Sequence, residues 1–168
     1  MKILFTLESS AGMEVTMKQI KGGVTAAKGF KAASTAAGIK YKDRTDMAMI
    51  YSEVPCAVAG TFTTNIVKAA PVKWDQHVVY DSKKAQAVIV NAGIANACTG
   101  EEGMGYCKAT AEKVNKLLQI PTDEVLVAST GVIGMQLPID RICAGVETMV
   151  PHCLLYTSPS PRDRQKSR

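Results

Sequence analysis

A threonine and a glycine stand together where an apolar stretch of the sequence ends. Residues 125–129 are mostly Val, Leu and Ala; Thr130 and Gly131 follow, and a second glycine comes at position 134. Glycine turns of this kind expose backbone N–H groups. Together with a threonine hydroxyl, such groups can hold the oxygen of a carbonyl group as it becomes an anion. Thr130 and Gly131 are therefore candidates for an oxyanion-stabilising site.

The same pair also fits a purely structural role. In a turn that leads from a strand to a helix, glycine permits a positive φ and threonine satisfies a nearby backbone group. Taken without further context, the two residues fit this role better than catalysis.

Two other polar segments are candidates for lining a site. Residues 91–100 form a loop rich in Asn, Gly and Thr, and residues 61–65 read Thr-Phe-Thr-Thr-Asn. Both could contact a substrate. The first fits better as turn chemistry, in which side chains bond to their own backbone. The second could equally be an ordinary strand end.

Read together, these segments resemble one family. Residues 20–30, 68–72, 91–100 and 129–134 resemble the bifunctional ornithine acetyltransferase/glutamate N-acetyltransferase family of arginine biosynthesis, and the similarity continues to about Val150. Family members usually carry Ser and Asn where this sequence has Ala92 and Ile94. The loop after residue 90 therefore has two polar groups fewer than expected.

The resemblance implies an activity and a role for each candidate residue. The activity is transfer of an acetyl group from N-acetylornithine to glutamate, with Thr130 donating its hydroxyl and Gly131 its backbone N–H to the oxyanion. Family enzymes cut themselves before a threonine, which becomes the nucleophile of the second fragment. No segment of this chain matches that threonine's surroundings. We therefore expect an incomplete first fragment that is inactive alone.

The resemblance also implies partners. We expect no metal and no tightly bound cofactor, although some members accept acetyl-CoA as the acetyl donor. The expected protein partners are the chain's own C-terminal (beta) fragment and a second copy, in a heterotetramer of two alpha and two beta chains.

Two alternative functions stay open. The first is a non-catalytic small-molecule-binding or regulatory module of the same fold, which Ala92 and Ile94 mildly favour. The second is a related amidohydrolase that uses water as the acceptor.

The two ends of the chain differ in character from its middle. Residues 1–16 are expected to be a non-native or disordered leader, with Met17 as the natural start, and residues 17–152 the N-terminal part of the acetyltransferase domain. Residues 153–168 show no apolar period and resemble translated sequencing-adaptor read-through, the alternative being a disordered basic tail. The four Arg and Lys residues after Pro161, against Asp163, supply +3 of the net charge of +5.

Charge, hydropathy and cysteine usage bound the environment. Without the tail's charge there is little reason to expect a nucleic-acid partner, and no apolar run reaches the roughly 18 residues of a membrane span. The five cysteines form an odd set without paired spacing, which argues against a disulfide framework and a zinc site. Cys98 and Cys107 are expected to be buried small side chains. We expect a cytoplasmic protein, or a mitochondrial one in a eukaryote.

Strands and helices are expected to alternate in the second half of the chain, where they would position these residues. Strands are expected at 46–52, 57–64, 85–91 and 125–130. A helix with a capping box at Thr99 and Glu102 should follow the third strand and end before Pro121, and another should begin at Pro138. The expected fold is α/β and layered, with mixed sheets and packed helices. The resemblance implies an αββα-type sandwich, here incomplete.

Overall fold

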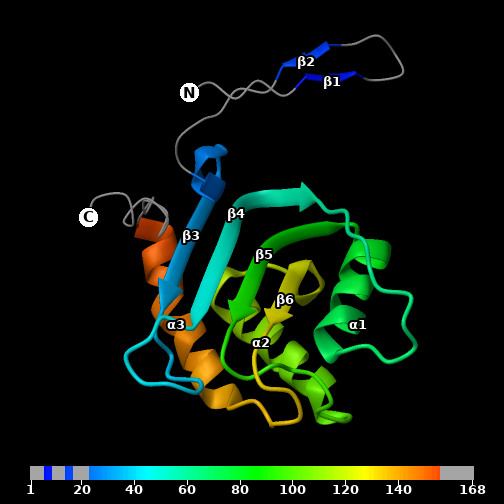
Figure 1. Ribbon diagram of the computed structural model, residues 1–168. Helices are drawn as coiled ribbons and strands as arrows, with labels where there is room; N and C mark the ends of the chain where they lie inside the picture. Colours follow the sequence, from blue (N-terminus) through cyan, green and yellow to red (C-terminus); the bar gives the residue numbers. More distant parts are fainter. Residues whose placement is uncertain (1–5, 9–13, 17–22, 156–168) are drawn as a thin grey trace.

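A mixed sheet forms the centre of the protein. The structure, a computed structural model, describes residues 6–8, 14–16 and 23–155. The main sheet has the order β3 (Phe30–Thr35), β4 (Met47–Ala57), β5 (Lys84–Asn91) and β6 (Val125–Ser129) (Figure 1). The first three strands pair antiparallel, and β5 and β6 pair parallel. A separate antiparallel pair consists of β1 (Thr6–Glu8) and β2 (Glu14–Thr16).

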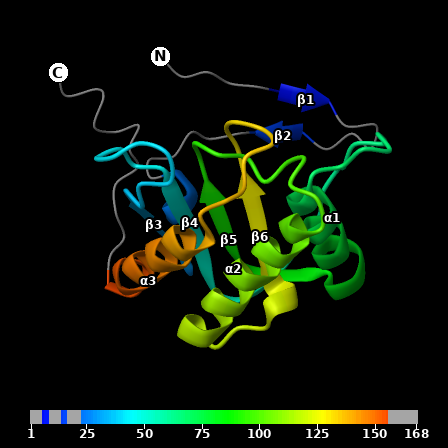
Figure 2. The ribbon, with the colours of Figure 1, turned by 90° about the horizontal axis from the view of Figure 1, so that it is seen from below.

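The helices form a second layer. Helices α2 (Glu102–Leu118) and α3 (Ile139–Leu155) pack against each other on one face of the sheet, and the shorter α1 (Ala70–His77) lies beside β6 and α2 (Figure 2). Three single turns, η1 (Gly23–Ala26), η2 (Val78–Ser82) and η3 (Thr122–Glu124), complete the connections. The expected α/β fold with a mixed sheet and packed helices is confirmed.

The core lies between the helices and the sheet. Strand residues on this face alternate with outward ones, as the period of two requires. Both helices contribute stripes spaced by three and four residues. The fully buried side chains include Met47, Met49, Ile89, Val114, Val125, Val146 and Met149. With few aromatic residues available, methionine and branched aliphatic side chains fill this core.

The first half of the chain differs from expectation. The strands expected at 46–52 and 57–64 are one long strand, β4, whose pairing with β5 shifts between Tyr51 and Cys56. A bulge of this kind bends a strand without ending it. Residues 58–64 form no strand. β3 and α1 were not expected, although Pro71 at the start of α1 is a recognised signal for a first helical turn.

The prediction of a capping box at Thr99 and Glu102 is wrong. Helix α2 begins at Glu102, its N-cap residue is Glu101, and no side chain caps its first N–H groups. The Thr99 hydroxyl instead donates to the Asn96 side-chain oxygen at 2.7 Å, and Glu102 accepts a hydrogen bond from the Tyr106 hydroxyl at 3.0 Å. Spacing alone could not show that a neighbouring asparagine competes for the threonine hydroxyl.

Helix α3 continues through the boundary expected between residues 152 and 153. It runs to Leu155, and Cys153 is completely buried in the core. The break in composition therefore comes after the last core residue of the helix. Most of the expected tail, 156–168, lies outside the described residues, as does most of the leader 1–16. Among the described helices, none combines the length and the hydropathy of a membrane span.

Two side chains of α1 cover the open edge of β6. The Trp74 indole N–H donates to the Val125 carbonyl oxygen at 2.8 Å, and the Val127 N–H donates to the Asp75 carboxylate at 2.9 Å. An edge strand otherwise presents unpaired backbone groups that invite pairing with another chain. Helix α1 thus takes the place of a fifth strand at this edge.

The buried position of Asp75 predicts a pH-dependent stability. Burial raises the pKa of this carboxyl from 3.8 to about 6, and the Val127 N–H offsets part of that rise. The folded state therefore holds the proton more tightly than the unfolded state, so stability is lost as the pH rises from about 4 to about 6. Asp75→Asn keeps the acceptor oxygen and cannot ionise. Relative to this variant, we expect wild type to lose about 1–2 kcal/mol over that range, a figure discounted for partial exposure.

Urea unfolding at several pH values measures this difference directly. Groups that titrate in both proteins cancel in the comparison. Parallel stability profiles for wild type and Asp75→Asn would show that the Asp75 carboxyl does not titrate in this way.

No helix covers the sheet face opposite α2 and α3 within the described residues (Figure 1). Ile50, Val88 and Leu126 lie on the strands at positions that alternate with the core and are only partly buried. Outside the strands, the loop residues Ile66, Val67 and Ile133 are also more than half exposed. Large apolar patches commonly mark contact surfaces. We expect the isolated chain to associate or precipitate at micromolar concentrations in sedimentation experiments. A stable monomer with a sharp two-state transition would contradict this expectation.

Candidate active site

Thr130 and Gly131 lie at the carboxyl end of β6, next to the carboxyl end of β5. The two strands run parallel and in register, with Asn91 opposite Ser129. Loops that leave neighbouring parallel strands meet at one edge of a sheet, where α/β proteins place their sites. The loop 92–100 and the loop 130–138 are therefore neighbours.

A ladder of backbone hydrogen bonds joins the two loops. The Thr130 N–H donates to the Asn91 carbonyl oxygen at 3.0 Å, and the Val132 N–H donates to that of Gly93 at 3.1 Å. The Ala95 N–H donates back to the Val132 carbonyl oxygen at 2.9 Å. Strand-like pairing thus continues past the ends of β5 and β6 and fixes one loop against the other.

Gly131 permits the close approach of these loops. Its φ is +131°, and a Cβ atom built there would lie 2.3 Å from the Gly93 carbonyl carbon and 2.6 Å from the Ile94 nitrogen. No other residue type fits without moving the backbone. The structural role that the sequence allowed for this glycine is therefore real, and it is compatible with a role for its N–H.

The two candidate donor groups have no acceptor within the described part of the molecule. Neither the Thr130 hydroxyl nor the Gly131 N–H donates a hydrogen bond to a residue described by the structure, and both residues are exposed. Around them most polar groups are paired. Donors left free by the protein are one requirement of a site that binds an oxyanion.

The asparagine-rich loop has an internal structural role. Asn91 and Asn96 are almost completely buried. The Asn91 amide donates to the Ile94 carbonyl oxygen at 2.9 Å, and the Asn96 amide donates to that of Gly103 at 2.8 Å. The Ser129 hydroxyl accepts the Asn96 N–H at 2.9 Å. These side chains bond to backbone groups of the loop and of helix α2, which is the turn chemistry expected for this segment.

The two positions that lost polar side chains have different surroundings. Ile94 is 5% exposed and belongs to the hydrophobic core. Ala92 is exposed and lines a cavity. Only the change at residue 92 therefore alters a surface that a ligand could reach.

Residues 61–65 lie away from this place. They form an exposed loop in which the Asn65 N–H donates to the Thr63 hydroxyl and the Asn65 side chain accepts the Val67 N–H, both at 3.1 Å. These are local turns, and the segment does not line the cavity beside Gly131.

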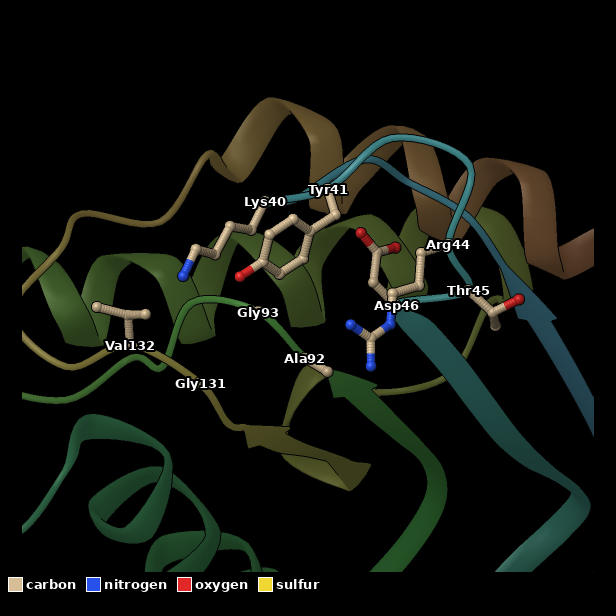
Figure 3. Close-up of a pocket in the computed structure, with 9 residues that line it drawn as sticks. All are labelled: Lys40, Tyr41, Arg44, Thr45, Asp46, Ala92, Gly93, Gly131 and Val132. Atoms are coloured by element: carbon tan, nitrogen blue, oxygen red, sulfur yellow. The ribbon is translucent and has the colours of Figure 1, made fainter.

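No sequence pattern indicated the other wall of that cavity. A hollow of about 380 Å³ lies between the 40–46 loop and the two loops already described (Figure 3). Lys40, Tyr41 and Arg44 line it on one side, and Ala92, Gly93, Gly131 and Val132 on the other. Residues 40–46 lie between β3 and β4, far from Gly131 in sequence. Only the pairing of β4 with β5 brings them close, so no local pattern could have revealed them.

The cysteines are unsuited to a nucleophilic role. Burial raises the pKa of the Cys107 thiol to about 12, and the thiolate is the reactive form. Cys107 thus behaves as a small core residue, as expected. Cys98 was expected to be buried as well, but it is exposed, with a φ of +55° in the asparagine-rich loop.

The fold and this turn define an α/β protein with a pair of free hydrogen-bond donors beside a cavity, a class that includes enzymes of acyl transfer. A family model described as the ArgJ family matches residues 31–164. The chain belongs to the ArgJ family.

Individual relatives agree with this assignment. The chain is 50% identical over 131 residues to the arginine biosynthesis bifunctional protein ArgJ of Gloeobacter violaceus, covering 78% of this chain and 32% of the relative. It is 46% identical over 134 residues to the chloroplastic ArgJ of Zea mays, covering 79% of this chain and 29% of the relative. The chain thus spans about a third of the length of the curated relatives it matches.

Solved structures give the same result. Ornithine acetyltransferase from Mycobacterium tuberculosis, determined in complex with ornithine, has a TM-score of 0.73 and 47% identity, with 78% of this chain and 70% of that chain covered. ArgJ from Bacillus halodurans has a TM-score of 0.70 and 45% identity, with 74% and 65% covered.

Proposed function

We propose that this chain is the N-terminal part of an acetyltransferase that moves an acetyl group from N-acetylornithine to glutamate. The products are ornithine and N-acetylglutamate. The observation that carries the proposal is the pair of unpaired donors at Thr130 and Gly131, in a chain of the ArgJ family. The bacterial structural relative bound to ornithine supports the substrate class.

The proposed chemistry proceeds in two steps. A threonine supplied by the C-terminal part of the protein attacks the acetyl carbonyl carbon, and the carbonyl oxygen becomes an anion. The Thr130 hydroxyl and the Gly131 N–H stabilise this anion until ornithine leaves and the acetyl group is bound to the nucleophile. The amine of glutamate then attacks the acetyl-enzyme through a second tetrahedral intermediate held by the same two donors. The bond to the threonine oxygen breaks, that oxygen takes up the proton that the amine loses, and N-acetylglutamate leaves the regenerated nucleophile.

Rigid loops favour this role for the turn. Donors that are already oriented need no rearrangement as charge develops, which is why preorganised sites stabilise transition states well. The ladder from Asn91 to Val132 holds Thr130 and Gly131 in place before any ligand binds. Acetyl-CoA is an alternative acetyl donor in this reaction. The reaction requires no tightly bound cofactor and no metal.

The chain is proposed to act with two kinds of protein partner. The uncovered apolar sheet face would receive the second sheet of an αββα sandwich, contributed by the C-terminal (beta) fragment after self-cleavage, and two such pairs would form the heterotetramer. A cytoplasmic location is proposed for a bacterial source. Plant relatives are chloroplastic, and no relative described above supports a mitochondrial location.

Product analysis tests the proposal. The full-length gene product is incubated with N-acetylornithine and glutamate, and ornithine, N-acetylglutamate and acetate are quantified. We expect ornithine and N-acetylglutamate in equal amounts, and no turnover by the 168-residue chain alone. Ornithine with acetate and no N-acetylglutamate would instead support an amidohydrolase.

The non-catalytic alternative has less support. It was suggested by the loss of polar groups at residues 92 and 94, but Ile94 is a core residue and does not face the cavity. Only Ala92 remains as an argument for it. Absence of any product with the full-length protein would revive this alternative.

A further inference from the structure

Two cations face the cavity beside Gly131. Lys40 and Arg44 flank the Tyr41 ring, with the Lys40 Nζ 5.1 Å and the Arg44 Cζ 5.8 Å from its centroid (Figure 3). The same cavity is lined across from them by the glycines of the two active-site loops. Stacking on a shared ring holds two positive charges on one wall.

Neither cation has an acidic partner in the described part of the chain. No carboxylate lies within 4.0 Å of the Lys40 or Arg44 side-chain nitrogens among these residues. Asp46 is the only acidic one among the described residues that line the cavity. Its two oxygens accept the Ala37 and Ile39 N–H groups, each at 2.7 Å. Its carboxylate is thus committed to the backbone, and the two cations outnumber it.

The wall that carries the cations is anchored to the site. The Ala92 N–H donates to the Asp46 carbonyl oxygen at 2.8 Å, which joins the 40–46 loop to the loop before Gly93. Arg141 of α3 donates to the Gly38 carbonyl oxygen at the other end of the segment. A Cβ atom at Gly93 would lie 3.1 Å from the Lys40 Cβ, so these loops already touch. The cavity is therefore a preformed feature of the fold.

We propose that Lys40 and Arg44 form a subsite for the anionic group of a substrate, a carboxylate or a phosphate. The proposal rests on the proposed function and deepens it. Carboxylate and phosphate oxygens are the natural partners of ammonium and guanidinium groups. Because Gly131 lines this cavity and also offers its N–H, an anionic group held here lies next to the reacting acetyl group. The carboxylates of N-acetylornithine and glutamate meet this condition, because each is attached to the carbon that bears the acetylated nitrogen. The phosphates of acetyl-CoA carry the same kind of charge, but the pantetheine arm separates them from the acetyl group, and coenzyme A is therefore the probe that distinguishes this second source.

Binding calorimetry on the full-length gene product tests the subsite without relying on turnover. The probes are glutamate, N-acetylornithine, coenzyme A and inorganic phosphate. The variants are Lys40→Gln and Arg44→Gln, singly and together. Lys42→Gln is the matched control, because Lys42 is an exposed residue of the same loop that does not line the cavity. Thermal melting checks that each variant is folded.

We expect each cavity substitution to weaken binding of at least one probe about tenfold, and Lys42→Gln to change it less than about twofold. Weaker binding of glutamate or N-acetylornithine assigns the subsite to a carboxylate. Weaker binding of coenzyme A and inorganic phosphate assigns it to a phosphate. Equal affinities in wild type and the double variant for all four probes would overturn the proposal.

Kinetics separates this subsite from the oxyanion turn. Lys40→Gln and Arg44→Gln should raise KM for the anionic substrate and leave kcat nearly unchanged, the pattern of lost ground-state binding. If the protein binds the probes through these residues but transfers no acetyl group, the proposed function fails and the subsite stands. If it transfers acetyl groups with KM independent of both residues, only the subsite fails.

Discussion

Thr130→Ala is expected to lower kcat for acetyl transfer by the full-length protein about 10²- to 10³-fold, with little change in KM. The hydroxyl has no acceptor among the described residues, so its removal leaves no buried group unpaired. What is lost is one donor to the oxyanion, and losing one donor of this kind has an effect of this size on turnover. Steady-state kinetics with N-acetylornithine and glutamate measures it.

Thr130→Ser is the matched control for this prediction. It keeps the hydroxyl and removes only a methyl group from an exposed position, so most of the activity should remain. Equal loss in the serine and alanine variants would mean that the side chain matters for a reason other than its hydrogen bond.

Gly131→Ala is expected to abolish activity and to destabilise the protein. A methyl group at φ +131° would overlap the Gly93 carbonyl group and the Ile94 nitrogen, so the two loops must separate. The loss of stability should exceed the about 1–3 kcal/mol that an unfavourable backbone conformation alone costs, because the hydrogen bonds between the loops are also strained. Denaturant unfolding, together with the kinetic assay, measures both effects.

Gly134→Ala separates the two causes. Gly134 also has a positive φ, +83°, but a Cβ atom there would meet nothing within 4 Å. This variant should show the cost of backbone strain without the clash and should keep most of its activity. If Gly131→Ala were no worse than Gly134→Ala, the close approach of the loops would not be required.

The sequence predicts the fold correctly where apolar runs, helical stripes and turn residues all indicate the same element. β5, β6 and both long helices occur where apolar runs and stripes placed them, and Pro138 precedes α3 as expected. The first half was harder, since a bulge allows β4 to continue through residues that read as a turn between two strands. Cys153 shows the same limit, because burial at the end of α3 depends on packing and not on the residues that follow.

The candidate site was only partly predictable, for a related reason. Thr130, Gly131 and the asparagine-rich loop carry local signals, and the structure brings them together through the parallel pairing of β5 with β6. Lys40 and Arg44 carry none, because an exposed loop rich in Lys, Arg and Asp is ordinary surface composition. Their place beside Gly131 follows from the order of strands in the sheet, which residue types alone do not determine.

The central claim is that Thr130 and Gly131 bind the oxyanion of the reaction. Its most direct test is the affinity of the full-length protein for an analogue of N-acetylornithine in which a phosphonate replaces the acetyl carbonyl group. A transition-state analogue should lose affinity in Thr130→Ala by the same factor as kcat/KM, about 10²- to 10³-fold, while N-acetylornithine itself binds almost as before. Equal affinity of wild type and Thr130→Ala for the phosphonate would contradict the claim.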